Sequence, residues 1–214
     1  MAITTKSRAL GAIWGTCVAD ALGGPVQFKE PSTFPRITDL AYIANRKKPA
    51  GCVDHLSLFT SITNSGYSSF SDDGSMTLAL AQSFIDSQGK YNHALAIKWF
   101  VEWKYQGRFS SSTSAWDVGG STRKALAVWK DDGWKDVERT QRAITQKLDQ
   151  ESCSGNGSLM RISPIGVALW KDPDAAVLTA RQHSLPTHPA LACVEACAAF
   201  TQLISHAMRG MSFP

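Results

Sequence analysis

Two adjacent carboxylates and a neighbouring hydroxyl form the first group of residues with chemical potential. Ser71, Asp72 and Asp73 directly precede an apolar stretch with helical spacing. Side chains of these types can cap a helix, because they accept hydrogen bonds from its free N–H groups and oppose its positive dipole end. They are also the hard oxygen ligands that Mg²⁺ and Mn²⁺ prefer. The pattern leaves both interpretations open, and the second places a divalent cation on all three side chains.

A glycine-rich turn forms the second group. Residues 152–161 read Ser-Cys-Ser-Gly-Asn-Gly-Ser-Leu-Met-Arg, and an apolar segment follows. Free backbone N–H groups at such a turn, together with a helix dipole, can hold a phosphate. The segment lacks the Lys of a P-loop and follows no strand pattern, so neither nucleotide-binding fingerprint applies. Many ordinary turns share this composition.

Two shorter motifs and one isolated acid complete the set. Thr187 is placed to cap a helix that begins at His188, and residues 117–119 (Asp-Val-Gly) put an acid in a turn before another helix. Asp20 lies beside the apolar stripe of the first predicted helix. An acid in that position is costly unless it is hydrogen-bonded or exposed. We interpret it either as an exposed residue or as one that holds the following loop in place.

Helical periodicity dominates the elements that must position these residues, and no useful strand-like alternation occurs. The chain is therefore predicted to be an all-α, multi-helix bundle in one domain, residues 1–214. On the first helix, Gly11, Gly15 and Ala19 form a small face that another helix could approach closely. Residues 25–70 are predicted to be loop-like. The predicted helices cover residues 4–23, 71–84, 92–104, 121–131, 134–148, 159–170, 173–183 and 188–209.

Composition excludes several classes of protein. Hydrophobic residues make up 43% of the 214 residues and charged residues 19%, which fits a chain with a buried core rather than a disordered one. The net charge of +4 is dispersed apart from Arg46, Lys47 and Lys48, so we expect no nucleic-acid partner. No apolar run of about 18 residues occurs, and we expect no membrane partner.

The cysteines and the N-terminus indicate a cellular location. The five cysteines form neither a zinc pattern nor a disulfide framework, which favours a reducing compartment, and we expect a cytoplasmic protein. Cys193 and Cys197 are interpreted as small buried hydrophobes on one helix face. Residues 9–19 are similar to the apolar part of a signal peptide, but two glycines and the following Asp20 favour a buried helix instead.

The order of the motifs resembles the ADP-ribosylglycohydrolase family. Residues 11–28 resemble the opening segment of that family, and Ser-Asp-Asp-Gly-Ser-Met at 71–76 is similar to its Thr-Asp-Asp-Thr-x-Met metal motif. Residues 117–119 resemble its Asp-(Val/Ile)-Gly turn, and residues 155–161 its Gly-Asn-Gly-x-x-Met-Arg segment. Residues 187–188 match the Thr-His that precedes a long helix in the family. The resemblance covers nearly the whole chain.

The resemblance implies an orthogonal all-α bundle with two divalent metals, Mg²⁺ or Mn²⁺, in a cleft. The implied activity is hydrolysis that removes ADP-ribose from modified protein side chains or related compounds, so the implied partner is ADP-ribose or an ADP-ribosylated protein. Asp72 and Asp73 become catalytic residues and, with Ser71, metal ligands. The segments implied to line the ADP-ribose pocket contain Gly119, Cys153, Gly155, Asn156, Gly157, Ser158 and His188.

The chain departs from the family pattern at several positions. Gln27 stands where many members carry a catalytic Glu, and an amide can orient a water but cannot take its proton. Gly74 replaces a Thr of the metal motif, and Gly120 replaces a residue that is often polar. The second metal motif, Asp-x-Asp-Thr, does not occur, so we expect one ion or none and a family fold whose C-terminal part is missing.

Three functional hypotheses follow from the sequence. The first is an ADP-ribosyl hydrolase, either with reduced or lost activity or with its C-terminal part missing from this chain. The second is a descendant of the family that binds ADP-ribose or a related nucleotide without turnover, which Gln27 and the missing acids favour. The third is a structural protein that uses the bundle alone. We place the hydrolase first because Asp72, Asp73 and the Gly-Asn-Gly turn are retained.

Overall fold

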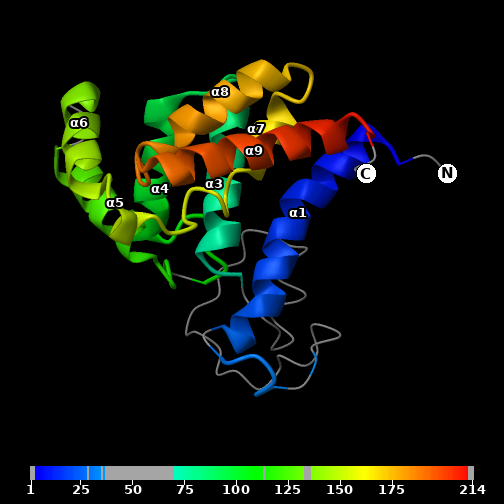
Figure 1. The fold of residues 1–214 in the computed structure, drawn as a ribbon, viewed down its shortest axis with the longest axis horizontal. Helices are drawn as coiled ribbons and strands as arrows, with labels where there is room; N and C mark the ends of the chain where they lie inside the picture. Colours follow the sequence, from blue (N-terminus) through cyan, green and yellow to red (C-terminus); the bar gives the residue numbers. More distant parts are fainter. Residues whose placement is uncertain are drawn as a thin grey trace.

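Helices account for all the regular secondary structure in the described part of the chain, as predicted (Figure 1). The computed structural model describes residues 3–27, 29–34, 36, 70–112, 114–132 and 136–211. Two 3-10 helices, η1 (Gly24–Val26) and η3 (Glu151–Cys153), join the longer elements. The α-helices are α1 (Thr5–Gly23), α3 (Asp72–Asp86), α4 (His93–Gln106), α5 (Gly120–Asp132), α6 (Val137–Leu148), α7 (Ser163–Ala168), α8 (Pro173–Ser184) and α9 (Leu191–Met208).

Local sequence signals explain most helix starts. The side chains of Thr4, Asn92, Asp136 and Asp172 each accept a hydrogen bond from a backbone N–H in the first turn of α1, α4, α6 and α8, respectively. Such caps satisfy donors that have no partner inside the helix. Gly107 ends α4 with a left-handed φ of 73°, a conformation that glycine adopts without steric cost.

The main core is formed where α3, α4, α5 and the α7–α9 segment meet. Its largest apolar side chains include Met76, Phe100, Trp103 and Trp129, which are all 0–1% exposed. The helix α9 packs along α8 and against α7, and α6 lies at the edge of the molecule on α5 (Figure 1). Burial of this apolar surface is the main driving force for folding.

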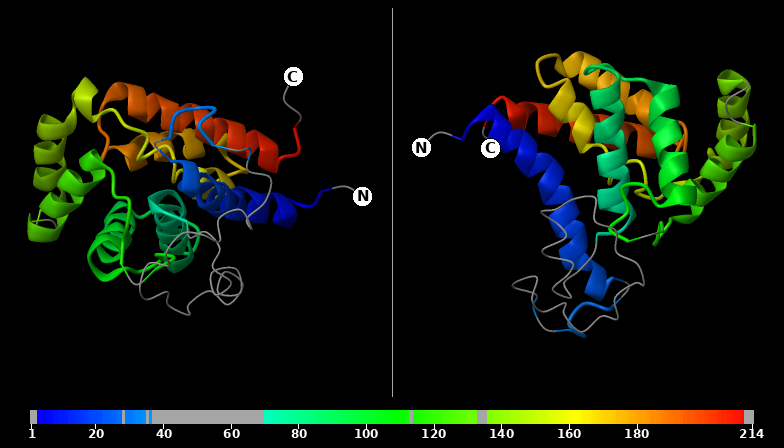
Figure 2. Two further views of the ribbon diagram at one scale, coloured as in Figure 1. Left: turned by 90° about the horizontal axis from the view of Figure 1, so that it is seen from below. Right: turned by 180° about the vertical axis from the view of Figure 1, so that it is seen from behind.

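Helix α1 runs from the end of α9 to the beginning of α3. The start of α1 meets the end of α9, and its last turns project from the body of the bundle (Figure 2). Between these ends, α1 packs against α3 and α7. The C-terminal half of α1 therefore faces the beginning of α3, which carries the Asp72 and Asp73 pair. Residues 37–69, which include Cys52, the basic triplet 46–48 and most of the loop predicted over 25–70, lie outside the described residues.

The small face predicted on α1 is wrong as a helix-packing surface. Gly11, Gly15 and Ala19 are all exposed, and a Cβ built on either glycine would have no described atom within 4 Å. The helix packs instead through Cys17 and Ala21, which are buried against Phe70. Small side chains permit close approach, but the neighbouring helices lie on the opposite face.

Two predicted helix boundaries also differ from the structure. The helix predicted over 159–170 is reduced to α7, because residues 157–161 form a turn and Pro164 lies in the first turn of the helix. The helix predicted from His188 begins at Leu191, and Thr187 does not cap it. His188 precedes Pro189, and a residue before proline is sterically disfavoured in the helical region.

By length and composition, α9 is the one helix among those described that could cross a membrane, where the sequence had predicted none. In this fold it packs against α7 and α8 and buries Cys193, Cys197, Ala198 and Thr201. Both cysteines are therefore buried on one helix face, as predicted. This packing is typical of a core helix in a bundle.

Candidate functional site

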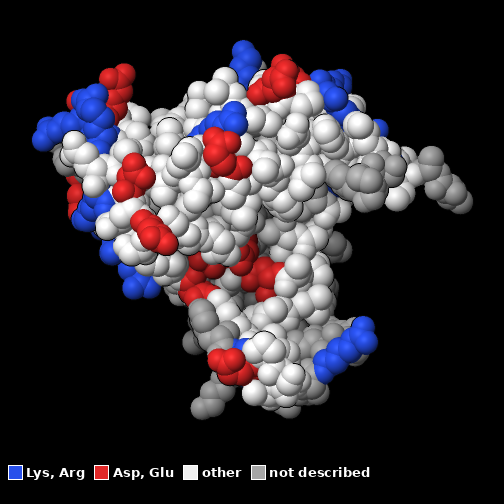
Figure 3. Space-filling model, viewed as in Figure 1, with Lys and Arg blue, Asp and Glu red and all other residues white. Residues whose placement is uncertain are grey.

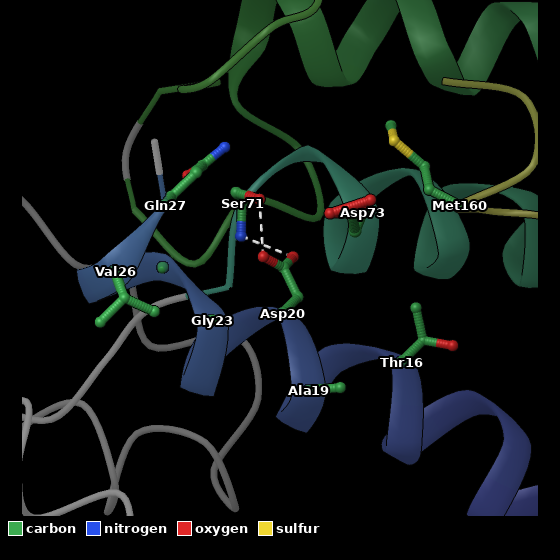
Figure 4. Close-up of a pocket in the computed structure, with 10 residues that line it drawn as sticks. Thr16, Ala19, Asp20, Gly23, Val26, Gln27, Ser71, Asp73 and Met160 are labelled. Carbon is green, nitrogen blue, oxygen red and sulfur yellow. Dashed lines mark hydrogen bonds between the residues drawn. The ribbon is translucent and has the colours of Figure 1, made fainter. Parts of the chain in front are cut away.

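Asp20 joins the end of α1 to the beginning of α3. Its carboxylate accepts hydrogen bonds from the Ser71 N–H at 2.7 Å, the Ser71 hydroxyl at 2.6 Å and the Gly74 N–H at 2.8 Å (Figure 4). Asp20 thus caps α3 from another helix, whereas the Ser71 side chain makes no cap to α3 itself. Asp20 is therefore hydrogen-bonded rather than freely exposed, and it holds the beginning of α3; most of the loop that it was predicted to hold lies outside the described residues.

A cavity of about 420 Å³ opens at this junction. Polar groups from α1, η1 and α3 face it together with the side chain of Met160 (Figure 4). Its polar lining combines acceptors and donors at short range, which suits a polar ligand. The lining residues are Thr16, Ala19, Asp20, Gly23, Gly24, Val26, Gln27, Ser71, Asp73 and Met160.

Four aspartates, Asp20, Asp72, Asp73 and Asp117, form an electrostatically coupled acidic cluster, and Asp20 and Asp73 line this cavity. Figure 3 shows acidic side chains gathered in the recess between the bundle and the projecting end of α1. Burial raises the pKa of Asp72 to about 7, and the charges of Asp73 and Asp117 add to this shift. Burial also raises the pKa of Asp73 to about 6, with contributions from Asp20 and Asp117. Among the described residues, no Lys or Arg forms an ion pair with any of the four.

Gln27 and Gly119 contact this cluster through hydrogen bonds. The Gln27 side-chain amide donates to an Asp117 carboxylate oxygen, and the Gly119 N–H donates to the Asp72 carboxylate. Asp117 adopts a left-handed φ of 54°, which a residue other than glycine rarely occupies. Strained backbone of this kind tends to occur at functional sites. The structure therefore brings together Gln27, Gly119 and the Asp72–Asp73 pair, as one end of a candidate site.

The cluster does not by itself complete a metal-ligand set. Within the described ranges, no three His, Cys, Asp or Glu side chains come together as ready ligands. The Ser71 hydroxyl is already engaged, since it donates to Asp20 and its lone pairs alone remain available. The donor chemistry nevertheless suits a hard cation, because uncompensated carboxylate oxygens face each other at low exposure.

The glycine turn (residues 155–157) lies just before Met160, which lines the same cavity as Asp73. In the part of the chain that the structure describes, the backbone N–H groups of Gly155, Asn156 and Gly157 donate to no backbone acceptor. A Cβ built on Gly157 would lie 2.6 Å from His188 Cε1 and 2.9 Å from Thr122 Oγ1, so only glycine fits there. The Thr122 hydroxyl is buried and has no partner among the described residues. These groups form a cradle of unused donors.

The other residues predicted for the ADP-ribose pocket lie at or below this turn. Asn156 is exposed and its carbonyl accepts the Met160 N–H. Ser158 is 0% exposed, and its hydroxyl accepts from Ser184 in the interior. The Cys153 side chain belongs to the hydrophobic core, while its carbonyl accepts from the Ser121 hydroxyl. Ser158 and Cys153 therefore support the turn from inside the bundle.

The departure at Gly74 has a steric reason. A Cβ built on Gly74 would lie 2.7–2.9 Å from the Phe70 side chain, which is 3% exposed. Thr at this position would therefore displace Phe70 from its packing against α1. The loss of one oxygen from the motif is coupled to how the segment before α3 packs.

Several contributors to the site, Asp20 and Met160 among them, were not predicted as site residues. Asp117 lies in the Asp-Val-Gly motif, and its carboxylate signal was present in the sequence. Thr122 and Thr16 gave no signal, because a threonine in a helix has no feature that separates a site residue from a core residue. Their placement depends on how distant helices pack.

Comparisons with known proteins agree with the fold and the motif order. The family model for ADP-ribosylglycohydrolase matches residues 1–213. The chain is 27% identical over 205 residues to the ADP-ribosylarginine hydrolase Tri1 of Pseudomonas putida (strain GB-1), covering 95% of this chain and 47% of that protein. It is 23% identical to Tri1 of Serratia proteamaculans (strain 568), covering 96% of this chain and 48% of that protein.

A third curated relative and a solved structure are also similar to the chain. The chain is 27% identical over 209 residues to the uncharacterized protein YegU of Escherichia coli (strain K12), covering 96% of this chain and 55% of that protein. A solved structure of an ADP-ribosylglycohydrolase-related protein complex is similar with a TM-score of 0.66 and 26% identity, covering 96% of this chain and 57% of that one. The chain thus spans about half the length of the curated relatives it matches.

Proposed function

Because the chain belongs to the ADP-ribosylglycohydrolase family, we propose that it binds an ADP-ribosyl group between the acidic cluster and the glycine turn and hydrolyses the bond that links this group to a protein side chain. One observation carries the proposal. Met160, three residues after a turn whose N–H groups have no acceptor among the described residues, lines the same cavity as Asp20 and Asp73, which have no described ion-pair partner. The acidic cluster suits a cation and ribose hydroxyls, and the turn suits phosphate oxygens.

The glycine turn is the proposed phosphate end. Its N–H groups at Gly155, Asn156 and Gly157 are free for a ligand, and the Thr122 hydroxyl beside Gly157 is a further donor without a partner among the described residues. Convergent backbone donors of this kind bind anions without any basic side chain. Met160, which follows the turn, reaches the cavity that Asp73 also lines, so one ligand can contact both ends.

The acidic cluster is the proposed cation end. Asp72 and Asp73, with a lone pair of Ser71, would hold Mg²⁺ or Mn²⁺, and water would supply the remaining ligands because the described residues provide too few. When bound, such a cation polarises hydroxyl groups and neutralises carboxylate charge. The fit rests on the donor chemistry, because two carboxylates and a hydroxyl lie together at the beginning of α3 with no described ion-pair partner. Burial, with added repulsion from neighbouring aspartates, raises the pKa of both carboxyl groups, and a bound cation would favour their ionised form.

The chain's own residues hold the reacting groups in place. Asp20 fixes the first turn of α3, so the Asp72–Asp73 pair cannot shift relative to α1. The Gln27 amide nitrogen is held by Asp117, which leaves its carbonyl oxygen free to accept a hydrogen bond from a water. Hydrolysis breaks the bond from the anomeric carbon to the side-chain atom, and the oxygen of water takes the vacated position. The hydroxyl group of the water stays on the anomeric carbon, and its other proton goes to the departing side chain.

The relatives indicate a substrate to try first. Two of the similar proteins are named ADP-ribosylarginine hydrolase, and we propose arginine-linked ADP-ribose as the substrate. The guanidinium of such a substrate is a cation and would be attracted to the acidic cluster.

A second candidate function is binding of ADP-ribose without turnover. Gln27 favours it, because an amide that is bonded to Asp117 cannot accept a proton from water. The binding groups at the glycine turn do not depend on Gln27, so loss of turnover would leave them intact.

The test measures thermal midpoint and product release together. The purified chain is melted with and without ADP-ribose plus Mg²⁺, and ADP-ribosylated arginine is then assayed for release of ADP-ribose by chromatography. A ligand that binds only the folded state at about 100 times its Kd stabilises it by about 3 kcal/mol, which raises the midpoint by several degrees. A shift with release supports the hydrolase, a shift without release supports the second candidate, and no shift contradicts both.

A matched pair of variants tests the cation end. Asp72→Asn combined with Asp73→Asn should abolish the part of the midpoint shift that depends on Mg²⁺. Asp149→Asn changes the same side-chain charge at an exposed position outside the site and should keep that part. An undiminished Mg²⁺ effect in the double variant would overturn the assignment of Asp72 and Asp73.

A further inference from the structure

Arg161 is a fully buried cation that forms no ion pair with a carboxylate of the described residues. Its guanidinium lies 4.5 Å from the centre of the Phe100 ring and donates to His183, Thr187 and the sulfur of Met76. These partners come from α3, α4, α8 and the segment before α9. Burial of an ion is costly unless its hydrogen bonds are satisfied. Every contact of this guanidinium is to a neutral group, so its charge is held for a reason other than ion pairing.

The donor rules fix where the protons lie along this network. An arginine side chain only donates, so the Thr187 hydroxyl oxygen accepts from Arg161 Nη2 at 2.7 Å. The Thr187 proton must then point elsewhere. Its one hydrogen-bond acceptor among the described residues is His188 Nδ1, at 2.9 Å. When the Thr187 proton takes this acceptor, His188 Nδ1 accepts and the proton of the neutral imidazole lies on Nε2.

The same rules apply to His183. Arg161 Nε donates to His183 Nε2 at 3.0 Å, which places the His183 proton on Nδ1. Burial and the Arg161 charge both lower the pKa of His183, and they lower that of His188 to about 3. Both imidazoles are therefore neutral near pH 7. One guanidinium sets the tautomer of two histidines, and only His188 reaches the glycine turn.

The Nε2 edge of His188 lies against the glycine turn. A Cβ built on Gly157 would lie 3.0 Å from this nitrogen, and one built on Gly155 would lie 4.0 Å from it. No hydrogen bond to Nε2 occurs among the described residues, although the imidazole is only 3% exposed. An N–H donor without a partner thus lies beside the unused backbone N–H groups of the turn.

We propose that Arg161 is a positioning residue that acts through Thr187 to hold His188 as the neutral Nε2–H tautomer, with this N–H aimed at an acceptor oxygen of a ligand on the glycine turn. The identity of the ligand as an ADP-ribosyl group rests on the proposed function, whereas the proton relay does not. Without Thr187, His188 could adopt the other tautomer and present a lone pair that repels a phosphate or hydroxyl oxygen. The relay therefore converts an ambiguous imidazole into a fixed donor.

The relay is tested at Thr187, where the isosteric Thr187→Val removes only the hydroxyl. In the unmodified chain, long-range ¹H–¹⁵N spectra of His188 should show the Nε2–H tautomer before any ligand is added. Thr187→Val should mix the two tautomers and weaken ADP-ribose binding about tenfold by calorimetry, as expected for one lost hydrogen bond. Thr187→Ser keeps the hydroxyl and should restore both the tautomer and the Kd to within about twofold.

The matched control is Thr201→Val, which makes the same change at a buried threonine whose hydroxyl has no partner among the described residues. It should change neither the tautomer nor the Kd. An Nδ1–H tautomer in the unmodified chain would overturn the relay, and so would a Thr187→Val variant with unchanged spectra and affinity. If the unmodified chain binds no ADP-ribose, the proposed function fails, and the tautomer alone then decides the relay.

Discussion

At the start of α3, four aspartates are coupled beside an open cavity that Asp20 and Asp73 line, whereas one turn further along the helix, beside Met76, the guanidinium of Arg161 lies fully buried. The acidic cluster has negative charge without a described cation, and the Arg161 network has positive charge without a contacting carboxylate. In the network, each nitrogen of the guanidinium group donates to a neutral partner, and one of these partners is the Met76 sulfur. In the cluster, burial and the charges of neighbouring aspartates raise the pKa values of Asp72 and Asp73, and no described cation forms an ion pair with them.

The Arg161 network is therefore typical of a protein interior, whereas the acidic cluster is typical of a site that binds a ligand. Arg161 makes hydrogen bonds to both histidine and threonine side chains, so removing it damages the protein itself. The Asp72 and Asp73 carboxylates destabilise the folded state while they lack a counter-ion, so removing them should stabilise the ligand-free protein. We therefore expect substitution of Arg161 to lower the free energy of unfolding, and substitution of Asp72 and Asp73 to raise it in the ligand-free protein.

The largest effect should come from Arg161→Met, which keeps much of the side-chain volume but removes all donors. His183 Nε2 and the Thr187 hydroxyl then lose their buried partner, at a cost of about 3 kcal/mol in the free energy of unfolding. For a chain of this size the thermal midpoint should fall by about 10 °C. Arg139→Met, at an exposed position on α6, is the control and should have little effect. Equal midpoints for the two variants would contradict the importance of the buried network.

A smaller effect is expected from pH in the protein without divalent cations. The pKa values of Asp72 and Asp73 are raised in the folded state, so folding takes up protons above pH 4, and stability falls as pH rises toward 7. His183 and His188 have lowered pKa values and act in the opposite sense, which a comparison with the Asp72→Asn, Asp73→Asn variant removes.

Between pH 5 and pH 8, the midpoint of that double variant should rise relative to the unmodified chain by at least about 5 °C. Saturating Mg²⁺ should reduce the difference at pH 8, because the cation stabilises ionised carboxylates. Parallel midpoint curves for the two proteins across this range would show that the carboxylates are not coupled to folding.

The sequence could predict most of the fold because the necessary signals are local. Helical periodicity and capping residues such as Asn92 and Asp136 mark helix starts without reference to the rest of the chain. The predicted start of the last helix at His188 is wrong. Thr187 resembles a helix cap, but Pro189 disfavours a helical conformation at His188, and α9 begins at Leu191. The packing face predicted for α1, which carries Gly11, is wrong because residue size alone does not determine which side of a helix other helices cover.

The candidate site was less accessible to prediction because its contacts are long-range. Ser71 was interpreted as either a cap or a ligand, but the cap of α3 is Asp20, 51 residues earlier in the chain. The role of Arg161 likewise depends on a threonine 26 residues away. Motif order indicated which segments matter, whereas the pairing of side chains emerges only when the helices pack.

The smallest effect should come from Gln27→Glu, which adds a fifth carboxylate to the acidic cluster beside Asp117. The Gln27 amide donates to Asp117, so Glu would replace a hydrogen bond with repulsion and lower the midpoint of the cation-free protein by about 2 °C. Mg²⁺ should reverse this loss, because an added oxygen ligand strengthens its binding. If the missing base limits turnover, release of ADP-ribose should increase about tenfold or more. Gln202→Glu on the exposed face of α9 carries the same charge change and should alter neither quantity. If the midpoint and the release of ADP-ribose are unchanged in Gln27→Glu, as in this control, Gln27 does not belong to the charged site, and the acidic cluster ends at Asp117.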